Sequence, residues 1–280
     1  MIIRKNIVRS LIQASLALAT MSLLSGCIVV ASASNADVHL KKELTLSASA
    51  FKTLDIEAGA GGLIIQGSDQ ATDIIVSADI YTSNKSTSDY EFDLSDSGTT
   101  AFLVAKSNSS GMWVGNSPHI DLVITVPTEM MLKINDGSGE IDIANIKGAI
   151  NLTDGSGSLS ISEVRNDVNI KDGSGKITLN NITGNVAIDD GSGDINLSDV
   201  AGDLLIEDGS GSIFARGVGG NADINDGSGD LTVKQVTGII TLDDGSGDID
   251  IEDAGGLKII DSGSGGLKVS NVKGGFEIDS

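Results

Sequence analysis

The tetrapeptide Asp-Gly-Ser-Gly recurs every 18 residues through the second half of the chain, in seven intact copies and one degraded copy at 262–265. Self-similarity at a fixed short period is typical of proteins built from stacked units, because one such unit cannot bury its own apolar face. The intact copies start at Asp136, Asp154, Asp172, Asp190, Asp208, Asp226 and Asp244.

Apolar residues occupy fixed positions within each repeat. Counted from the Asp as position 1, aliphatic side chains recur at positions 6, 8, 11, 15 and 17. Spacings of two indicate β-strands with alternate side chains inward, and the odd spacings mark corners. Position 13 is usually Gly, as at Gly148 and Gly184, which suits a corner that needs a positive φ or leaves no room for a side chain.

The pattern predicts an all-β fold, a single-stranded parallel β-helix of about eight 18-residue coils preceded by irregular strand-rich opening coils. Helices are excluded, since three glycines per repeat would each cost about 1 kcal/mol relative to Ala. A right-handed helix is favoured, because left-handed coils of this length prefer three regular hexapeptides. Aromatic residues make up only 3% of the chain, which fits a thin core filled by aliphatic side chains.

The seventh coil departs from the pattern. Position 15 there is Lys258, whereas Leu257 and Ile259 alternate one place early. A bulge near Ile260 and Asp261 would absorb this slip in register.

The N-terminal segment has the features of a secretory signal. Residues 1–26 hold Arg4, Lys5 and Arg9 and no acid, and the apolar run that follows the basic residues is short for a membrane span. Cys27, the only cysteine, follows Leu-Ser-Gly and resembles the acylated residue of the bacterial lipobox. Ile28 in the next place, instead of Asp, resembles lipoproteins sent to the outer membrane. The resemblance implies a palmitate-bearing envelope protein that is attached through its N-terminal lipid, with the outer membrane favoured over the inner.

Four segments are expected along the chain. Residues 1–26 are the lipoprotein signal peptide, 27–44 the lipidated Cys and a flexible spacer, 45–135 an irregular β opening or cap, and 136–280 the regular repeats. Without the signal, 254 residues remain with 15 basic and 39 acidic side chains. A surface this acidic repels phosphate backbones, so nucleic acid is excluded as a partner.

The stacked aspartates have two interpretations. As a turn device, each Asp accepts a backbone N–H from the Gly-Ser-Gly that follows it. As a cation site, neighbouring acids in two coils would offer several oxygens to Ca²⁺, the only cofactor that the sequence suggests. The turn interpretation is favoured, because position 5 also holds Ser158, Lys176 and Ser212. The candidate calcium ligands are Asp189, Asp190 and Asp194 in one coil and Asp243, Asp244 and Asp248 in the other.

Signals of catalysis are weak, and we expect no enzyme and no catalytic residues. The two histidines, His39 and His119, lie in the spacer and beside Pro118, where a surface role is favoured over catalysis or a paired-histidine metal site. The last coil ends with Phe276 and Ile278 and no cap. We therefore expect self-association, an envelope partner or a frayed end there.

The Asp-Gly-Ser-Gly ladder with Gly at position 13, and the segment Leu122–Pro127 leading into Leu132–Ile134, resemble a bacterial family of β-strand-repeat, adhesin-like proteins of unknown function. The resemblance covers roughly residues 45–280 and implies no catalytic residues. The predicted function is a non-enzymatic, lipid-anchored stalk or contact surface of the cell envelope. The alternatives are a calcium-stabilised binding module and, more remotely, a carbohydrate-active enzyme.

Overall fold

The computed structural model describes residues 35–83, 86, 88–108, 113 and 115–278. The chain divides into two compact units, residues 1–32 and 33–280, and every described residue belongs to the second. Apart from one short 3₁₀ turn, η1 (Ala48–Ala50), its regular structure consists of β-strands. No helix within these described ranges is long and apolar enough to span a membrane.

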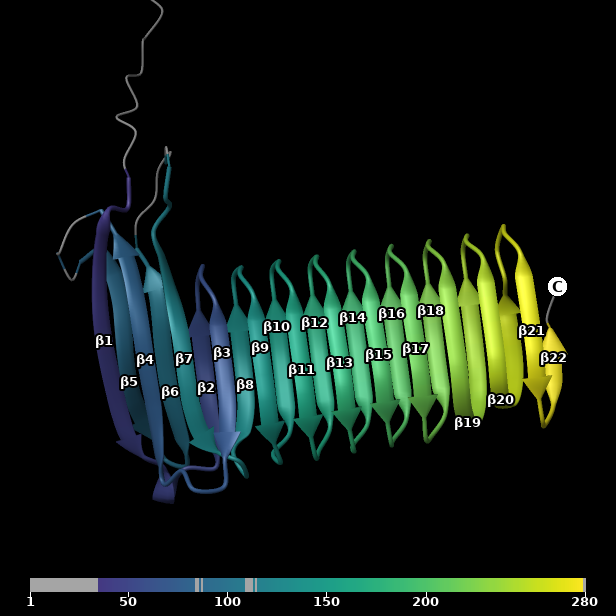
Figure 1. Cartoon of the computed structure of the whole chain (residues 1–280), viewed down its shortest axis with the longest axis horizontal. Helices are drawn as coiled ribbons and strands as arrows, with labels where there is room; N and C mark the ends of the chain where they lie inside the picture. The colour runs from purple at the N-terminus through teal and green to yellow at the C-terminus, as the bar shows by residue number, and fades with distance from the viewer. Residues whose placement is uncertain (1–34, 84–85, 87, 109–112, 114, 279–280) are drawn as a thin grey trace, which may run out of the picture. The chain divides into compact units, whose positions relative to one another are not determined.

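Each regular repeat forms one coil with two strands, and strands of successive coils lie side by side (Figure 1). The pairing is parallel and in register, with Leu159 opposite Ile177 and Val168 opposite Val186. The predicted parallel β-helix is therefore confirmed. The first strands of the coils form one stack: β9 (Ile141–Ile146), β11 (Leu159–Val164), β13 (Ile177–Ile182), β15 (Ile195–Val200), β17 (Ile213–Val218) and β21 (Leu267–Val272).

The second strands of the coils form the facing stack, and two long strands turn the corner and belong to both. The long strands are β19 (Leu231–Asp244) and β20 (Ile249–Asp261). The other strands of the second stack are β8 (Met131–Asp136), β10 (Ile150–Asp154), β12 (Val168–Asp172), β14 (Val186–Asp190), β16 (Leu204–Asp208), β18 (Ala222–Asp226) and β22 (Phe276–Ile278).

The two stacks enclose one continuous aliphatic core. The side chains at positions 6, 8, 11, 15 and 17 point inward as predicted, and in the coil that starts at Asp172 they are at most 2% exposed. Full burial stabilises each such side chain by about 1.5–3 kcal/mol. The residues of that coil are Ile177, Leu179, Ile182, Val186 and Ile188.

Position 10 makes the corner within the first strand of each coil. Its backbone is left-handed, with φ between 56° and 61° at seven non-Gly residues and 74° at Gly217. A left-handed residue reverses the alternation of a strand, so positions 8 and 11 both face the core although they are three apart. The seven residues are Asn145, Glu163, Asn181, Asp199, Gln235, Asp253 and Asn271.

The glycines at position 13 are required because the coil before leaves no room for a side chain, and not because φ is positive there. A Cβ built on Gly148 would lie 2.3 Å from the carbonyl oxygen of Met130 in the coil before. Positive φ is found instead at position 4, the second Gly of the tetrapeptide, where Gly193 has φ +147°. A Cβ there would lie 1.7 Å from the carbonyl oxygen of Gly175, so consecutive turns stack too closely for any side chain.

The predicted irregularity of the seventh coil is confirmed. Leu242 pairs with Ile259, whereas Asp243 pairs with Asp261, which leaves Ile260 as the extra residue of a bulge. The bulge restores the register before the last coil begins.

The opening region combines one coil with an antiparallel cap. Strands β2 (Thr53–Ala58) and β3 (Leu63–Ser68) pair in parallel with β8 and β9, while β1 pairs antiparallel with β4, β4 with β7, and β5 with β6. The cap strands are β1 (Val38–Ser47), β4 (Asp73–Thr82), β5 (Tyr90–Ser97), β6 (Thr100–Ser107) and β7 (His119–Pro127).

The expected flexible spacer, 27–44, is wrong from residue 38 onward. Residues 38–47 form β1, because Leu40, Leu44 and Leu46 alternate inward and pack against the core. Cys27 lies outside the described residues.

Substituting Gly193 with Ala tests the stacking of the turns. Because Gly193 has positive φ and no room for a Cβ, we expect Gly193→Ala to lower the free energy of unfolding by on the order of 3 kcal/mol in urea titrations. The control is Gly59→Ala, whose Cβ would lie 3.5 Å from its nearest neighbour and which should change stability by less than about 0.5 kcal/mol. Equal losses in the two variants would contradict the stacking argument.

Candidate functional site

The seven repeat aspartates form a buried column at the turn end of the second stack. Each is only 1–6% exposed. In β10, for example, Ile150, Leu152 and Asp154 alternate inward, so the Asp takes the third core-facing place of its strand. The acids therefore line the edge of the core and not an outer face.

Most of these carboxyls use one oxygen in the turn, whereas neither oxygen of Asp244 has a hydrogen-bond partner within the described part of the chain. In five of the aspartates Oδ1 accepts a hydrogen bond from the backbone N–H of the Ser two residues later, at 3.0–3.3 Å. The predicted turn device is thus present. The Oδ2 atoms of all seven aspartates are buried and have no hydrogen-bond partner within the described part of the chain.

Burial raises the pKa of the aspartates in the column. It raises the pKa of Asp136 to about 7, and the neighbouring carboxylate of Asp154 adds to that shift. Burial likewise raises the pKa of Asp190 to about 6 and that of Asp226 to about 7. Burial raises the pKa of the other four aspartates as well, so the column retains protons to a higher pH than exposed aspartates do.

The first group of candidate calcium ligands does not converge. Asp190 faces the core, whereas its neighbour Asp189 faces outward and pairs with Lys171 at 2.8 Å. Asp194 accepts the backbone N–H of Ser212 at 3.2 Å.

The second group is divided in the same way, because adjacent residues of a strand project to opposite faces. Asp244 is buried, Asp243 precedes it on the outer face, and Asp248 accepts the backbone N–H of Gly266 at 2.8 Å. Among the described residues, no group of three or more His, Cys, Asp or Glu side chains could hold a metal ion.

The two histidines, 80 places apart in sequence, meet on the outer face of the cap. His39 of β1 and His119 of β7 lie in register on either side of Tyr81 of β4. The three rings stack, with centroids 4.6 Å apart for His39 and Tyr81 and 4.4 Å apart for Tyr81 and His119. Sequence reasoning missed this cluster, because nothing local fixes the register of three distant strands.

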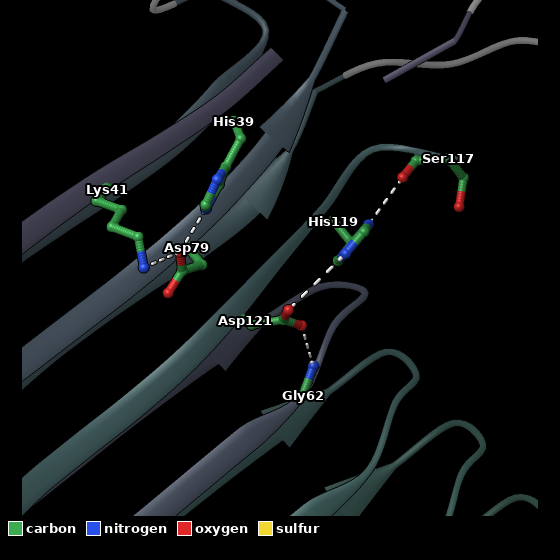
Figure 2. Close-up of polar contacts among 7 residues, drawn as sticks. All are labelled: His39, Lys41, Gly62, Asp79, Ser117, His119 and Asp121. Atoms are coloured by element: carbon green, nitrogen blue, oxygen red, sulfur yellow. Dashed lines mark hydrogen bonds and ion pairs between the residues drawn. The ribbon is translucent and has the colours of Figure 1, made fainter. Parts of the chain in front are cut away.

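Each histidine of the cluster has a carboxylate beside it (Figure 2). Asp79 contacts Lys41 at 2.9 Å and also His39, and the hydrogen bonds from Lys41 and then His39 hold the pKa of Asp79 below its usual range. Asp121 lies 3.9 Å from His119 and accepts the backbone N–H of Gly62 at 2.8 Å. The cluster is an exposed polar patch whose charges are internally paired.

A shallow hollow lies on the outer face of the second stack, between β2 and β16, with a volume of about 780 Å³. Its middle is lined by amides one coil apart, and Asn169 donates to Asn151 at 3.1 Å. Lys133 pairs with Asp55 at 2.7 Å at one end, and Lys171 pairs with Asp189 towards the other. Strand side chains alone form this surface, without long loops from the turns.

These features define a β-solenoid whose coils share one thin core and one buried acid column. The family model Toastrack DUF4097 matches residues 51–279, and the chain belongs to this family. No curated protein matches the sequence.

Several solved structures resemble the chain. A proposed lipid-binding protein from Parabacteroides distasonis is 18% identical over 86% of this chain and 97% of its own, with a TM-score of 0.50, and shares the fold. A proposed cell adhesion protein from Clostridium sporogenes is 15% identical over 86% of this chain and all of its own, with a TM-score of 0.42. A proposed adhesin from Bacteroides fragilis is 15% identical over 86% of this chain and 97% of its own, with a TM-score of 0.40.

The buried column predicts an unusual dependence of stability on pH. The folded-state pKa values of about 6–7 exceed the ordinary 3.8. Between about pH 4 and pH 7 the native protein therefore binds more protons than the unfolded chain. The column's contribution to the free energy of unfolding is therefore full below about pH 4 and falls as the pH rises towards 7. Urea titrations at pH 5 and pH 8 measure this effect.

An isosteric substitution isolates the contribution of one carboxyl. Asp190→Asn removes the titration, so we expect the variant to gain at least about 1 kcal/mol over the wild type at pH 8 and less at pH 5. The matched control is Asp189→Asn, next along the strand but outward, which should show no such pH-dependent gain. A pH response shared by both variants would contradict a buried, protonated column.

Proposed function

We propose that this chain is a non-enzymatic, lipid-anchored protein of the bacterial cell envelope that serves as a stalk and contact surface, in the manner of an adhesin. The observation that carries the proposal is the order of pairing in the two stacks. Strands β1 and β5 come first and β21 and β22 last, with the regular coils between them. An anchor that precedes β1 would thus be joined by the chain to the cap and not to the last coil.

The lipid anchor is argued from the sequence. Cys27 is the only cysteine, it follows a basic and then apolar segment, and it precedes Val38 of β1 by 11 residues. A chain of that length spans at most about 40 Å, so an acyl group on Cys27 would hold the cap close to the membrane. Ile28 favours the outer membrane as the destination.

A role without catalysis fits the regularity of the coils. Active sites are commonly built from loops on a rigid scaffold, whereas the coils between Asp136 and Asp244 keep one length and have only tight turns. The lysines that line the hollow on the second stack are paired with carboxylates. The outer faces are therefore better suited to binding a partner surface than to catalysing a reaction.

Substituting Cys27 tests the anchor. We expect Cys27→Ser to abolish incorporation of labelled palmitate and to move the protein from the detergent phase to the aqueous phase in Triton X-114 partition. Ser32→Ala, five residues later, is the control and should remain acylated and membrane-bound. Retention of the Cys27→Ser variant in the detergent phase would overturn the proposal.

Deleting whole and half coils tests the stalk. Removal of residues 172–189, one complete coil, should leave a folded protein whose remaining coils stay in register. Removal of residues 172–180, half a coil, shifts all later residues by half a repeat. First strands would then lie over second strands of the neighbouring coil, which should prevent folding. Circular dichroism and limited proteolysis distinguish the two outcomes, and equal damage from both deletions would contradict independent coils.

A further inference from the structure

The last coil leaves both stacks open on one side. Strands β21 and β22 each pair with β20, and no other described strand lies beyond them. In the coil before, the backbone N–H of Ile249 donates to Gly266 at 2.8 Å, and that of Leu257 donates to Gly275 at 2.9 Å. The equivalent N–H groups, those of Leu267 and Phe276, therefore point to the open edge.

The side chains at this edge are core residues without a covering layer. Leu267, Phe276 and Ile278 are 39%, 55% and 45% exposed. The residues that pair with them in the coil before, Ile249, Leu257 and Ile259, are at most 2% exposed. One more coil-like layer would bury the three side chains to the same extent.

The last coil is the one 18-residue repeat without a net charge, in an acidic chain of net charge −21. Residues 262–279 hold two lysines and two acids, whereas residues 244–261 hold one lysine and six acids. Ser262 also replaces the buried Asp, so the acid column ends one coil before the edge. Two copies of the chain can therefore meet at this coil without net charge repulsion, whereas coils as acidic as 244–261 would repel one another.

The edge strands at the opposite end carry charges that discourage pairing. Lys41 and Lys42 are exposed on β1, and Glu91 and Asp93 are exposed on β5. Charged side chains are a common protection of edge strands. The C-terminal edge carries one charge on each strand, Lys268 on β21 and Glu277 on β22, and Lys268 is paired with Asp250 of the coil before at 3.0 Å. Beside these charges it exposes the apolar Leu267, Phe276 and Ile278.

We propose that two copies of this chain associate end to end through their last coils. A two-fold axis normal to the two stacks brings β21 beside β21 and β22 beside β22, each pair antiparallel. This arrangement continues both sheets at once, whereas a single added strand from another partner would complete only one. The inference is independent of the lipid anchor, because it concerns the opposite end of the stack.

Sedimentation velocity on the unlipidated chain, residues 28–280, tests the association. We expect a monomer–dimer equilibrium that shifts to dimer with concentration, and Phe276→Lys should weaken it at least tenfold by placing a charge at the edge. Leu205→Lys is the matched control, since Leu205 is 43% exposed on an outer face, and it should behave as the wild type. A wild type that stays monomeric to 0.2 mM, or a Phe276→Lys variant that dimerises equally well, would overturn the proposal.

A cysteine cross-link tests the symmetry without disturbing the edge. Because residues 28–280 contain no cysteine, Ser270→Cys in the middle of β21 introduces a single thiol near the two-fold axis. Mild oxidation should give a disulfide dimer in minutes with Ser270→Cys and at least tenfold more slowly with Ser162→Cys, its equivalent in an inner coil. Equal rates in the two variants would exclude the antiparallel arrangement.

Discussion

The structure depends on backbone hydrogen bonding between coils of equal length. With 18 residues per coil, the strand residues of the coils that start between Asp136 and Asp226 lie over their counterparts in the coil before, so each position has one environment in these coils. The seventh coil, with its bulge at Ile260, departs from this register. The choice of residue at a position then follows from the space above and below it. Aliphatic side chains fill the interior, and glycine is required where the backbones of successive turns approach within contact distance.

The same stacking that organises the core also brings like charges together. A column of buried carboxylates in adjacent coils would be strongly unfavourable if all were ionised, since burial and mutual repulsion both oppose the charge. The raised pKa values of Asp136, Asp190 and Asp226 indicate that protons are retained instead. A retained proton removes the charge of a carboxyl and with it the repulsion from its neighbours, while Oδ1 still accepts a hydrogen bond within the turn in five of the seven aspartates.

Most of the fold could be predicted because the repeat reveals its own register. The inward positions, the parallel coils and the bulge at Ile260 all follow from comparing one repeat with the next. The inward direction of the aspartates was also available, since position 1 of the next repeat continues the alternation of positions 15 and 17. It was missed because a charged residue in a turn is ordinarily exposed.

The cap could not be predicted to the same extent, because it has no internal repeat to align. The pairing of His39 with Tyr81 and of Tyr81 with His119 depends on the register of antiparallel strands from distant parts of the chain. Residues 38–44 of β1 resemble a spacer in sequence, because only alternate leucines mark the strand, among lysines and a glutamate.

A stack of coils repeats the same contacts in every layer, so the structure differs from the repeat at its two ends. Here one end has antiparallel strands with charged edges, and the other has an uncovered layer of core residues in a coil without net charge. Because this second end combines unpaired strands, exposed core residues and no net charge, a contact that continues the two stacks is best accommodated there.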